Sequence, residues 1–117
     1  MKKKITFCFD IDNTICKTTL SNYKDAKPDK EAIKMINKLY EKGHVIKINT
    51  ARYMGRNKDN IRKAKAQGYK KTYNQLKKWG LKFHELKFGK PSYDFFLDDK
   101  NIFFEKNWHD HFKKKYL

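Results

Sequence analysis

The chain has 117 residues, which is enough for one domain with a single hydrophobic core and too short for a second domain. Hydrophobic residues make up 38% of it and charged residues 36%. No apolar stretch approaches the ~20 residues that a membrane-spanning helix needs, so we expect one soluble domain over residues 1–117 with no membrane contact.

The N-terminal sequence indicates a cytoplasmic protein, and the two cysteines do not change that expectation. MKKK is similar to the basic start of a signal peptide, but only the short apolar run ITFCF follows before Asp10. That run is far shorter than the hydrophobic segment of a signal peptide. Cys8 and Cys16 lack the spacing of a zinc site, and we interpret them as reduced thiols that fill space.

The formal net charge of +16 comes mainly from lysines that are spread along the whole sequence. Only Arg52, Arg56 and Arg62 are arginines. Nucleic-acid binders concentrate their charge in a patch and favour arginine for contacts with phosphates and bases. The diffuse lysine excess therefore argues against nucleic acid as the partner and is compatible with a small anionic substrate.

The first half of the chain predicts a strand, a helix and a second strand. Residues 4–10 (KITFCFD) are apolar enough for a strand that is buried on both faces, as in a parallel sheet. Residues 11–27 are polar and irregular. A helix is predicted to begin at Pro28 and to stop at Gly43, followed by a strand at 44–50 (HVIKINT). Apolar side chains recur at helical spacing between these limits (Ile33, Ile36, Leu39, Tyr40).

The second half predicts two more strands and two more helices. Residues 51–68 are basic, contain two glycines and give only a weak helical signal. An amphipathic helix is predicted at 69–80, followed by strands at 82–88 (KFHELKF) and 93–99 (YDFFLDD). A final short helix would carry the aromatic residues near the C-terminus (Trp108, Phe112, Tyr116).

Strands that alternate with helices predict an α/β fold with a Rossmann-like parallel sheet of about four main strands, flanked by helices on both faces. In such sheets the ligand lies at the carboxyl ends of the strands. The residues that end or follow the four predicted strands are therefore the candidates for a functional site (Asp10, Asp12, Thr50, Lys90, Asp98, Asp99).

These side chains have complementary chemistry. Asp10 and Asp12 repel each other unless a cation lies between them. Clustered carboxylates provide the oxygen ligands that Mg²⁺ prefers, and a lysine with a hydroxyl can hold the oxygens of a phosphate. The set therefore predicts phosphoryl transfer through an aspartyl-phosphate, with Mg²⁺ as cofactor.

The order of these residues along the chain resembles that of the haloacid dehalogenase (HAD) superfamily of phosphatases. Its four motifs match FCFDIDNT, INTAR, FGKP and FFLDD, within residues 4–100. Receiver domains use a similar residue set, but their phosphorylated aspartate lies on a middle strand. TARYM with the basic loop after it, and FGKPSYDFFLDD, further resemble short bacterial HAD proteins associated with capsular polysaccharide biosynthesis.

The resemblance implies a role for each matched residue. Asp10 would be the nucleophile and a Mg²⁺ ligand. Asp12 would act as general acid and then as general base, and its backbone carbonyl would be a second metal ligand. The resemblance further implies phosphate-binding residues (Thr50, Ala51, Lys90) and carboxylates that complete the metal shell (Asp98, Asp99).

Many HAD enzymes carry a cap domain, but the unassigned stretches 15–27 and 51–68 are too short to form one. The resemblance therefore implies an HAD-like core without a cap, which accepts bulky substrates or borrows a lid from a neighbouring subunit in a homo-oligomer. Residues 52–63 would line the open site. There Arg52 or Arg56 would bind a carboxylate or hydroxyls of the leaving group, or the loop would simply be solvated.

Three functional hypotheses follow from the sequence. The main one is a Mg²⁺-dependent phosphomonoesterase for a phosphorylated sugar or sugar-linked metabolite, in capsular polysaccharide biosynthesis. The enzymatic alternative is a phosphatase for nucleotides or nucleic-acid 3′ ends, which the positive charge permits. The non-enzymatic alternative is a basic nucleic-acid-binding module with coincidental aspartates, and strongly salt-dependent binding to polynucleotide would be its signature.

Overall fold

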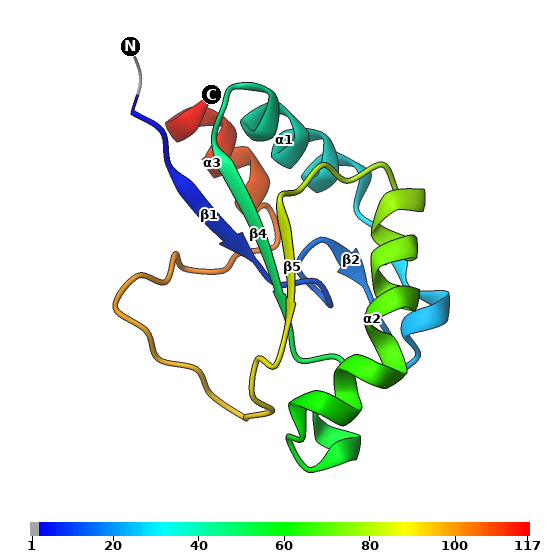
Figure 1. Ribbon diagram of the computed structural model, residues 1–117. Coiled ribbons are helices and arrows are strands. Elements are labelled where there is room, and N and C mark those ends of the chain that lie inside the picture. Colours follow the sequence, from blue (N-terminus) through cyan, green and yellow to red (C-terminus); the bar gives the residue numbers. More distant parts are fainter. Residues whose placement is uncertain (1–2) are drawn as a thin grey trace.

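The computed structural model describes residues 3–117, which form an α/β fold around a parallel three-stranded sheet (Figure 1). The strands are β1 (Thr6–Phe9), β4 (Val45–Thr50) and β5 (Glu85–Phe88), in the order β1-β4-β5. β1 and β5 each pair in parallel with β4. Within the described residues, the outer side of β1 therefore has no strand partner.

Three α-helices accompany the sheet. α1 (Lys30–Glu41) and α3 (Trp108–Tyr116) pack against each other, and α1 contacts the central strand β4. α2 (Ile61–Lys78) lies beside β5 (Figure 1). The predicted C-terminal helix is thus confirmed, and no helix of residues 3–117 has the length and apolar character to cross a membrane.

The hydrophobic core lies on one face of the sheet. Because side chains alternate along a strand, every second residue points to this face, where the rings of α3 and the apolar side of α1 cover it. The strand residues that face the core are buried (Phe7, Phe9, Ile46, Ile48, Leu86). Their neighbours on the opposite face are exposed (Thr6, Cys8, Lys47, Lys87), so in the described part of the chain only one face is covered, which differs from the prediction.

α1 begins at Lys30, two residues later than the sequence indicated. Asp29 is its N-cap, and the carboxylate accepts a hydrogen bond of 3.1 Å from the backbone N–H of Ala32. Pro28 belongs instead to a short antiparallel pair, β2 (Cys16–Lys17) with β3 (Lys27–Pro28). Gly43 follows the helix with a φ of 93°, as its predicted role in helix termination requires.

α2 is much longer than the predicted helix at 69–80. It starts after the N-cap Asn60, so residues 61–68 are helical although their apolar periodicity is weak. Small side chains explain the difference, because Gly68 leaves room for the aromatic ring of Tyr53 against the helix. A methyl group at Gly68 would overlap that ring.

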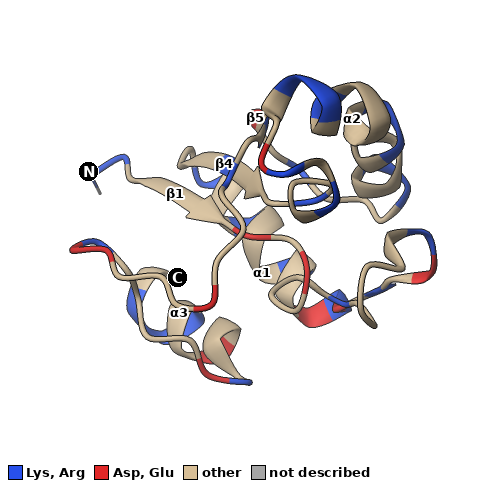
Figure 2. Cartoon of the chain, turned by 90° about the horizontal axis from the view of Figure 1, so that it is seen from below, with Lys and Arg blue, Asp and Glu red and all other residues tan. Residues whose placement is uncertain are grey.

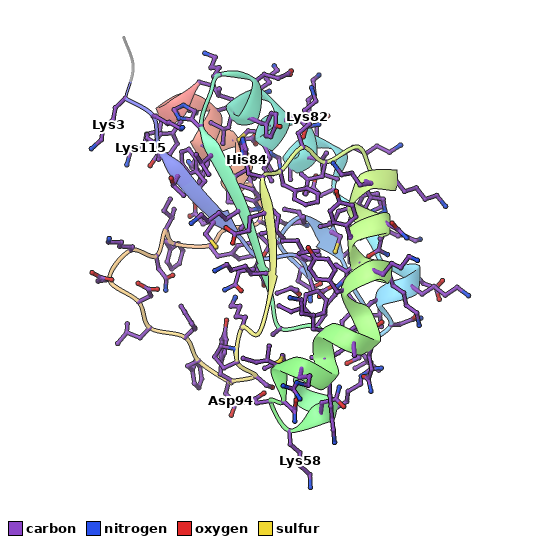
Figure 3. All side chains as sticks on the ribbon, viewed as in Figure 1. Lys3, Lys58, Lys82, His84, Asp94 and Lys115 are labelled. Atoms are coloured by element: carbon purple, nitrogen blue, oxygen red, sulfur yellow. The ribbon has the colours of Figure 1, made fainter. Side chains whose placement is uncertain are left out.

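The predicted strand at 93–99 is absent from the structure. The chain between β5 and α3 instead runs as an irregular loop beyond the outer side of β1 (Figure 1). Asp94 of this loop points away from the core in Figure 3. Phe95 is 95% exposed and Leu97 is 100% exposed, so apolar residues that alternate as in a strand lie in solvent.

Candidate active site

Three of the predicted site residues come together at the carboxyl edge of the sheet. Asp10 follows β1, Thr50 ends β4, and Lys90 lies two residues after β5. The backbone N–H of Lys90 donates to the carbonyl of Thr50 at 3.2 Å, which fixes the loop after β5. The Lys90 Nζ then lies 3.7 Å from Asp10 Oδ2.

Burial and charge act in opposite directions on this ion pair. Burial raises the pKa of Asp10, the Lys90 charge and the backbone N–H of Ile11 oppose the rise, and the Asp12 charge adds to it. Burial alone would lower the pKa of Lys90, but a hydrogen bond to Tyr93 and the Asp10 charge leave it raised. The ammonium group therefore keeps its charge at neutral pH beside a carboxyl group that is costly to ionise.

Thr50 and Ala51 occupy the turn at the end of β4. Thr50 is fully buried, and its Oγ1 accepts a hydrogen bond of 3.1 Å from the backbone N–H of Arg52. The hydroxyl proton of Thr50 can still be donated to a ligand oxygen. Ala51 is partly buried between these residues, so its backbone lies at the same edge as Asp10 and Lys90.

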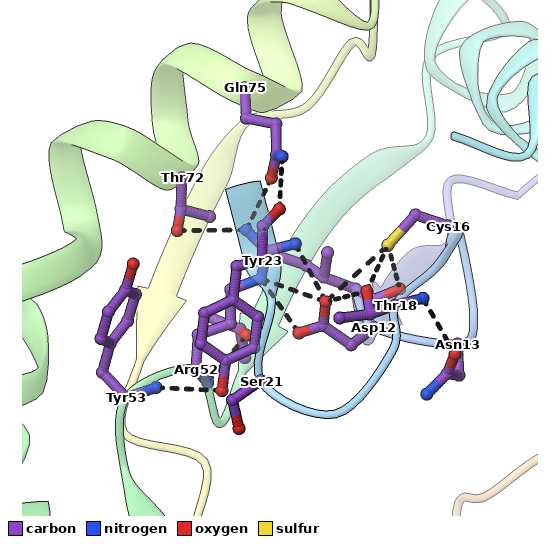
Figure 4. Close-up of polar contacts among 12 residues, drawn as sticks. Asp12, Asn13, Cys16, Thr18, Ser21, Tyr23, Arg52, Tyr53, Thr72 and Gln75 are labelled. Carbon is purple, nitrogen blue, oxygen red and sulfur yellow. Dashed lines mark hydrogen bonds and ion pairs between the residues drawn. The ribbon is translucent and has the colours of Figure 1, made fainter. Parts of the chain in front are cut away.

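Asp12 lies at the centre of a polar network that the sequence did not predict (Figure 4). Arg52 donates to it in bidentate fashion, with Nε 2.9 Å from Oδ2 and Nη2 2.9 Å from Oδ1. The Thr18 hydroxyl donates to Oδ1 at 2.6 Å. These bonds join the loop after β1 to the loop after β4.

The structure corrects the expected placement of Arg52 in an open loop. Its residue exposure is only 2%, and Nη1 donates to Gln75 Oε1 at 2.6 Å and to Thr72 Oγ1 at 3.4 Å. The ring of Tyr23 lies 4.8 Å from the guanidinium carbon. A guanidinium with this many internal partners holds Asp12 in place.

Arg56 fits the expectation of an accessible loop residue. It is exposed, and its guanidinium carbon lies 4.6 Å from the centre of the Tyr53 ring and 5.6 Å from that of Tyr23. Nη2 donates to the Ser21 carbonyl at 3.4 Å. The two tilted rings thus orient a cation at the surface near the Asp12 network.

Asp98 and Asp99 do not join the other site residues. Both are exposed in the loop between β5 and α3, where Asp98 Oδ1 accepts from the backbone N–H of Lys100 at 3.0 Å. This bond lowers the pKa of Asp98. Among residues 3–117, no three His, Cys, Asp or Glu side chains are close enough to hold a metal ion together, so Asp98 and Asp99 as they lie do not complete a metal shell with Asp10.

A cavity of about 450 Å³ separates the two acidic regions. Residues of β1 line it together with Asp10, Lys90 and residues of the loop after β5, among them Phe96 and Asp98. The loop would have to approach β1 across this cavity before Asp98 or Asp99 could share a ligand with Asp10.

Sequence reasoning missed the residues that hold Asp12 and Arg52, namely Thr18, Thr72 and Gln75. Thr18 lies in the polar segment 11–27, which carried no structural signal. Thr72 and Gln75 are polar residues of an amphipathic helix, and such residues usually face solvent. Only their position beside the loop after β4 identifies their role.

Comparison with known proteins bears on the fold alone. No family model matches the sequence, and no curated protein is significantly similar to it. The structure is similar to the crystal structure of an MCSG target from Vibrio cholerae, with a TM-score of 0.78 and 23% sequence identity. The match covers 94% of this chain and 98% of that one.

Proposed function

We propose that this chain is a Mg²⁺-dependent phosphomonoester hydrolase of the HAD superfamily, acting on a phosphorylated sugar or sugar-linked metabolite. The observation that carries the proposal is the Lys90 ammonium group 3.7 Å from the Asp10 carboxylate, at the edge where β4 also ends in Thr50. A carboxylate nucleophile needs a nearby cation before it can meet a phosphate dianion. The motifs suggest capsular polysaccharide biosynthesis as the setting.

The proposed reaction has two displacement steps. An Asp10 oxygen forms a bond to phosphorus while the bond to the leaving oxygen breaks, and Asp12 gives that oxygen a proton. Water then attacks phosphorus and gives its proton to Asp12, while the bond from phosphorus to Asp10 breaks. Lys90 and the Thr50 hydroxyl hold the other phosphate oxygens in both steps. A bound Mg²⁺ would supply further positive charge for the phosphate.

The complete site requires a fourth strand, which we propose that residues 93–99 form along the outer side of β1. Three features support this addition: the unpaired side of β1, the cavity beside it, and the exposed alternating side chains of Phe95 and Leu97. Pairing would bury these apolar side chains and bring Asp98 and Asp99 towards Asp10. The Mg²⁺ ligands would then come from both sides of the cavity.

The proposal is tested by phosphate release from a panel of sugar phosphates, nucleotides and 3′-phosphorylated oligonucleotides, with Mg²⁺ or with EDTA. We expect Mg²⁺-dependent turnover that is highest for a sugar phosphate and is abolished in Asp10→Asn. Asp12→Asn should retain substrate binding and lose turnover. Highest activity on a nucleotide or an oligonucleotide would change the proposed substrate from a sugar phosphate to that compound. If folded wild-type protein released no phosphate from any compound, the proposal would be overturned.

A further inference from the structure

We propose that Arg52 is a positioning residue for Asp12: its planar guanidinium fixes the orientation of the carboxylate and leaves Oδ2 with fewer hydrogen bonds than Oδ1. The inference rests on the proposed function, in which Asp12 is the acid and the base. It gives Arg52 a role in orienting Asp12, beside the predicted role in substrate binding.

The two oxygens of Asp12 have unequal surroundings. Oδ1 lies 2.6 Å from the Thr18 hydroxyl, 2.9 Å from Arg52 Nη2, 3.3 Å from Arg52 Nε and 3.8 Å from Cys16 Sγ. Oδ2 accepts only from Arg52 Nε, at 2.9 Å, among the residues described. A carboxylate oxygen offers about two lone-pair directions, so Oδ1 is saturated and Oδ2 keeps one acceptor direction free.

Arg52 is itself held from the opposite side. Nη1 donates to Gln75 Oε1 at 2.6 Å, and Gln75 Nε2 donates to the Tyr23 carbonyl at 2.8 Å. The Tyr23 ring and the hydroxyl of Thr72 complete the enclosure. The plane of the guanidinium is therefore fixed by α2 and by the segment that carries Tyr23, and Asp12 takes its orientation from that plane.

The geometry requires an arginine. Its planar fork matches both carboxylate oxygens at once, whereas lysine presents one flexible ammonium group. A lysine would keep the positive charge near Asp12 but would not fix which oxygen is free. Because small misplacements of a reacting group cost up to about 100-fold in rate, loss of orientation should lower kcat more than it affects substrate binding.

The test compares Arg52→Lys with Lys70→Arg, using the best substrate of the panel. Lys70 is exposed on α2, outside the segment expected to line the site, and serves as the charge-preserving control. We expect Arg52→Lys to lower kcat roughly 10- to 100-fold with KM changed by less than about twofold, and Lys70→Arg to leave both unchanged. Arg52→Lys in an Asp12→Asn background should cause no further loss.

A second measurement reports the contact without any turnover. In ¹⁵N NMR spectra, the buried Arg52 Nε–H should give a slowly exchanging signal that moves in Asp12→Asn. If Arg52→Lys does not fold, Gln75→Met removes a hydrogen bond behind the guanidinium and should lower kcat roughly 3- to 10-fold at constant KM.

The outcomes separate the two proposals. A wild type without turnover overturns both the hydrolase function and the role of Arg52. An active wild type with unchanged kcat in folded Arg52→Lys, or in Gln75→Met where that variant replaces it, overturns the role of Arg52 alone. An Arg52 signal that is indifferent to Asp12→Asn also overturns it.

Discussion

At the scale of the residue, Asp10 combines a functional position with an energetic cost. Its side chain is partly buried, and that burial outweighs the favourable charge of Lys90, so the pKa of Asp10 is raised. The folded protein therefore binds a proton on Asp10 more tightly than the unfolded chain does. Ionisation of this carboxyl group at neutral pH works against folding.

We expect Asp10→Asn to be more stable than the wild type at pH 7.5 in EDTA, and the difference to shrink towards pH 4. The raised pKa means that the stabilising proton is fully bound below the unfolded value near 3.8 and is lost as the pH rises through the folded value. An asparagine at this position does not ionise, so the variant loses no stability there as the pH rises. Urea unfolding at both pH values measures the difference, and a gain that does not change with pH would contradict the explanation.

The sequence predicted the residues of the sheet edge better than their orientation. Asp10, Thr50 and Lys90 meet because parallel strands end at one edge, and strand ends can be recognised from apolar runs. Whether the Arg52 side chain faces solvent or Asp12 depends on its partners in α2, which lie 20 and 23 positions away in the sequence. Spacing along the chain carries no information about that choice.

At the scale of the element, β1 and the loop after β5 are each incomplete. Among residues 3–117, β1 has no strand partner on its outer side, and the loop exposes the aromatic and aliphatic side chains of Phe95 and Leu97. An exposed strand edge is a template for another strand. The edge of β1 could therefore accept the loop as a further strand, and that pairing would cover the exposed apolar side chains of the loop.

We expect the backbone amides of residues 93–99 to become protected from hydrogen exchange when Mg²⁺ and vanadate bind together. Pairing with β1 would give these amides the backbone acceptors that they lack in the loop, and protection should rise at least about tenfold. Hydrogen exchange with mass spectrometry on peptides from this segment measures the change. Asp10→Asn serves as the control without a metal ligand, and equal exchange in all states would refute the added strand.

Secondary structure was predicted well where apolar periodicity was strong and poorly where small residues replaced it. α1 and the central strand were recognised because their buried residues recur at regular spacing. The first turns of α2 were not, because Ala64 and Gly68 pack closely without a hydrophobic pattern. Segment 93–99 has the apolar pattern of a strand but pairs with no strand among the described residues. Such a pattern cannot by itself supply the backbone hydrogen bonds of a sheet.

At the scale of the whole molecule, the charge of +16 is spread over the surface. Figure 2 shows Lys and Arg on α2, on α3 and before β1, with no single basic face in that view. The exposed pairs, such as Lys47 with Glu85 at 3.8 Å and Lys82 with Glu41 at 3.7 Å, offset little of the repulsion. The distribution agrees with the prediction of a solvated surface.

We expect the melting temperature to rise when NaCl increases from 20 mM to 500 mM. Salt screens the mutual repulsion of the lysines more than it weakens the few exposed ion pairs. Each kcal/mol of relieved repulsion should raise the melting temperature by roughly 4 °C. Circular dichroism melts at fixed pH measure the shift, and a fall with salt would mean that ion pairs contribute more than repulsion costs.

The ring of Tyr53 occupies the space that a side chain at Gly68 would fill, so the loop after β4 and the middle of α2 fit each other by shape. Arg52 and Arg56 flank this tyrosine, and Arg52 is bonded to α2 further along the helix. The loop and the helix therefore form one rigid body. A closing movement over the substrate would have to carry α2 with it, and the hinges would lie outside residues 52–78.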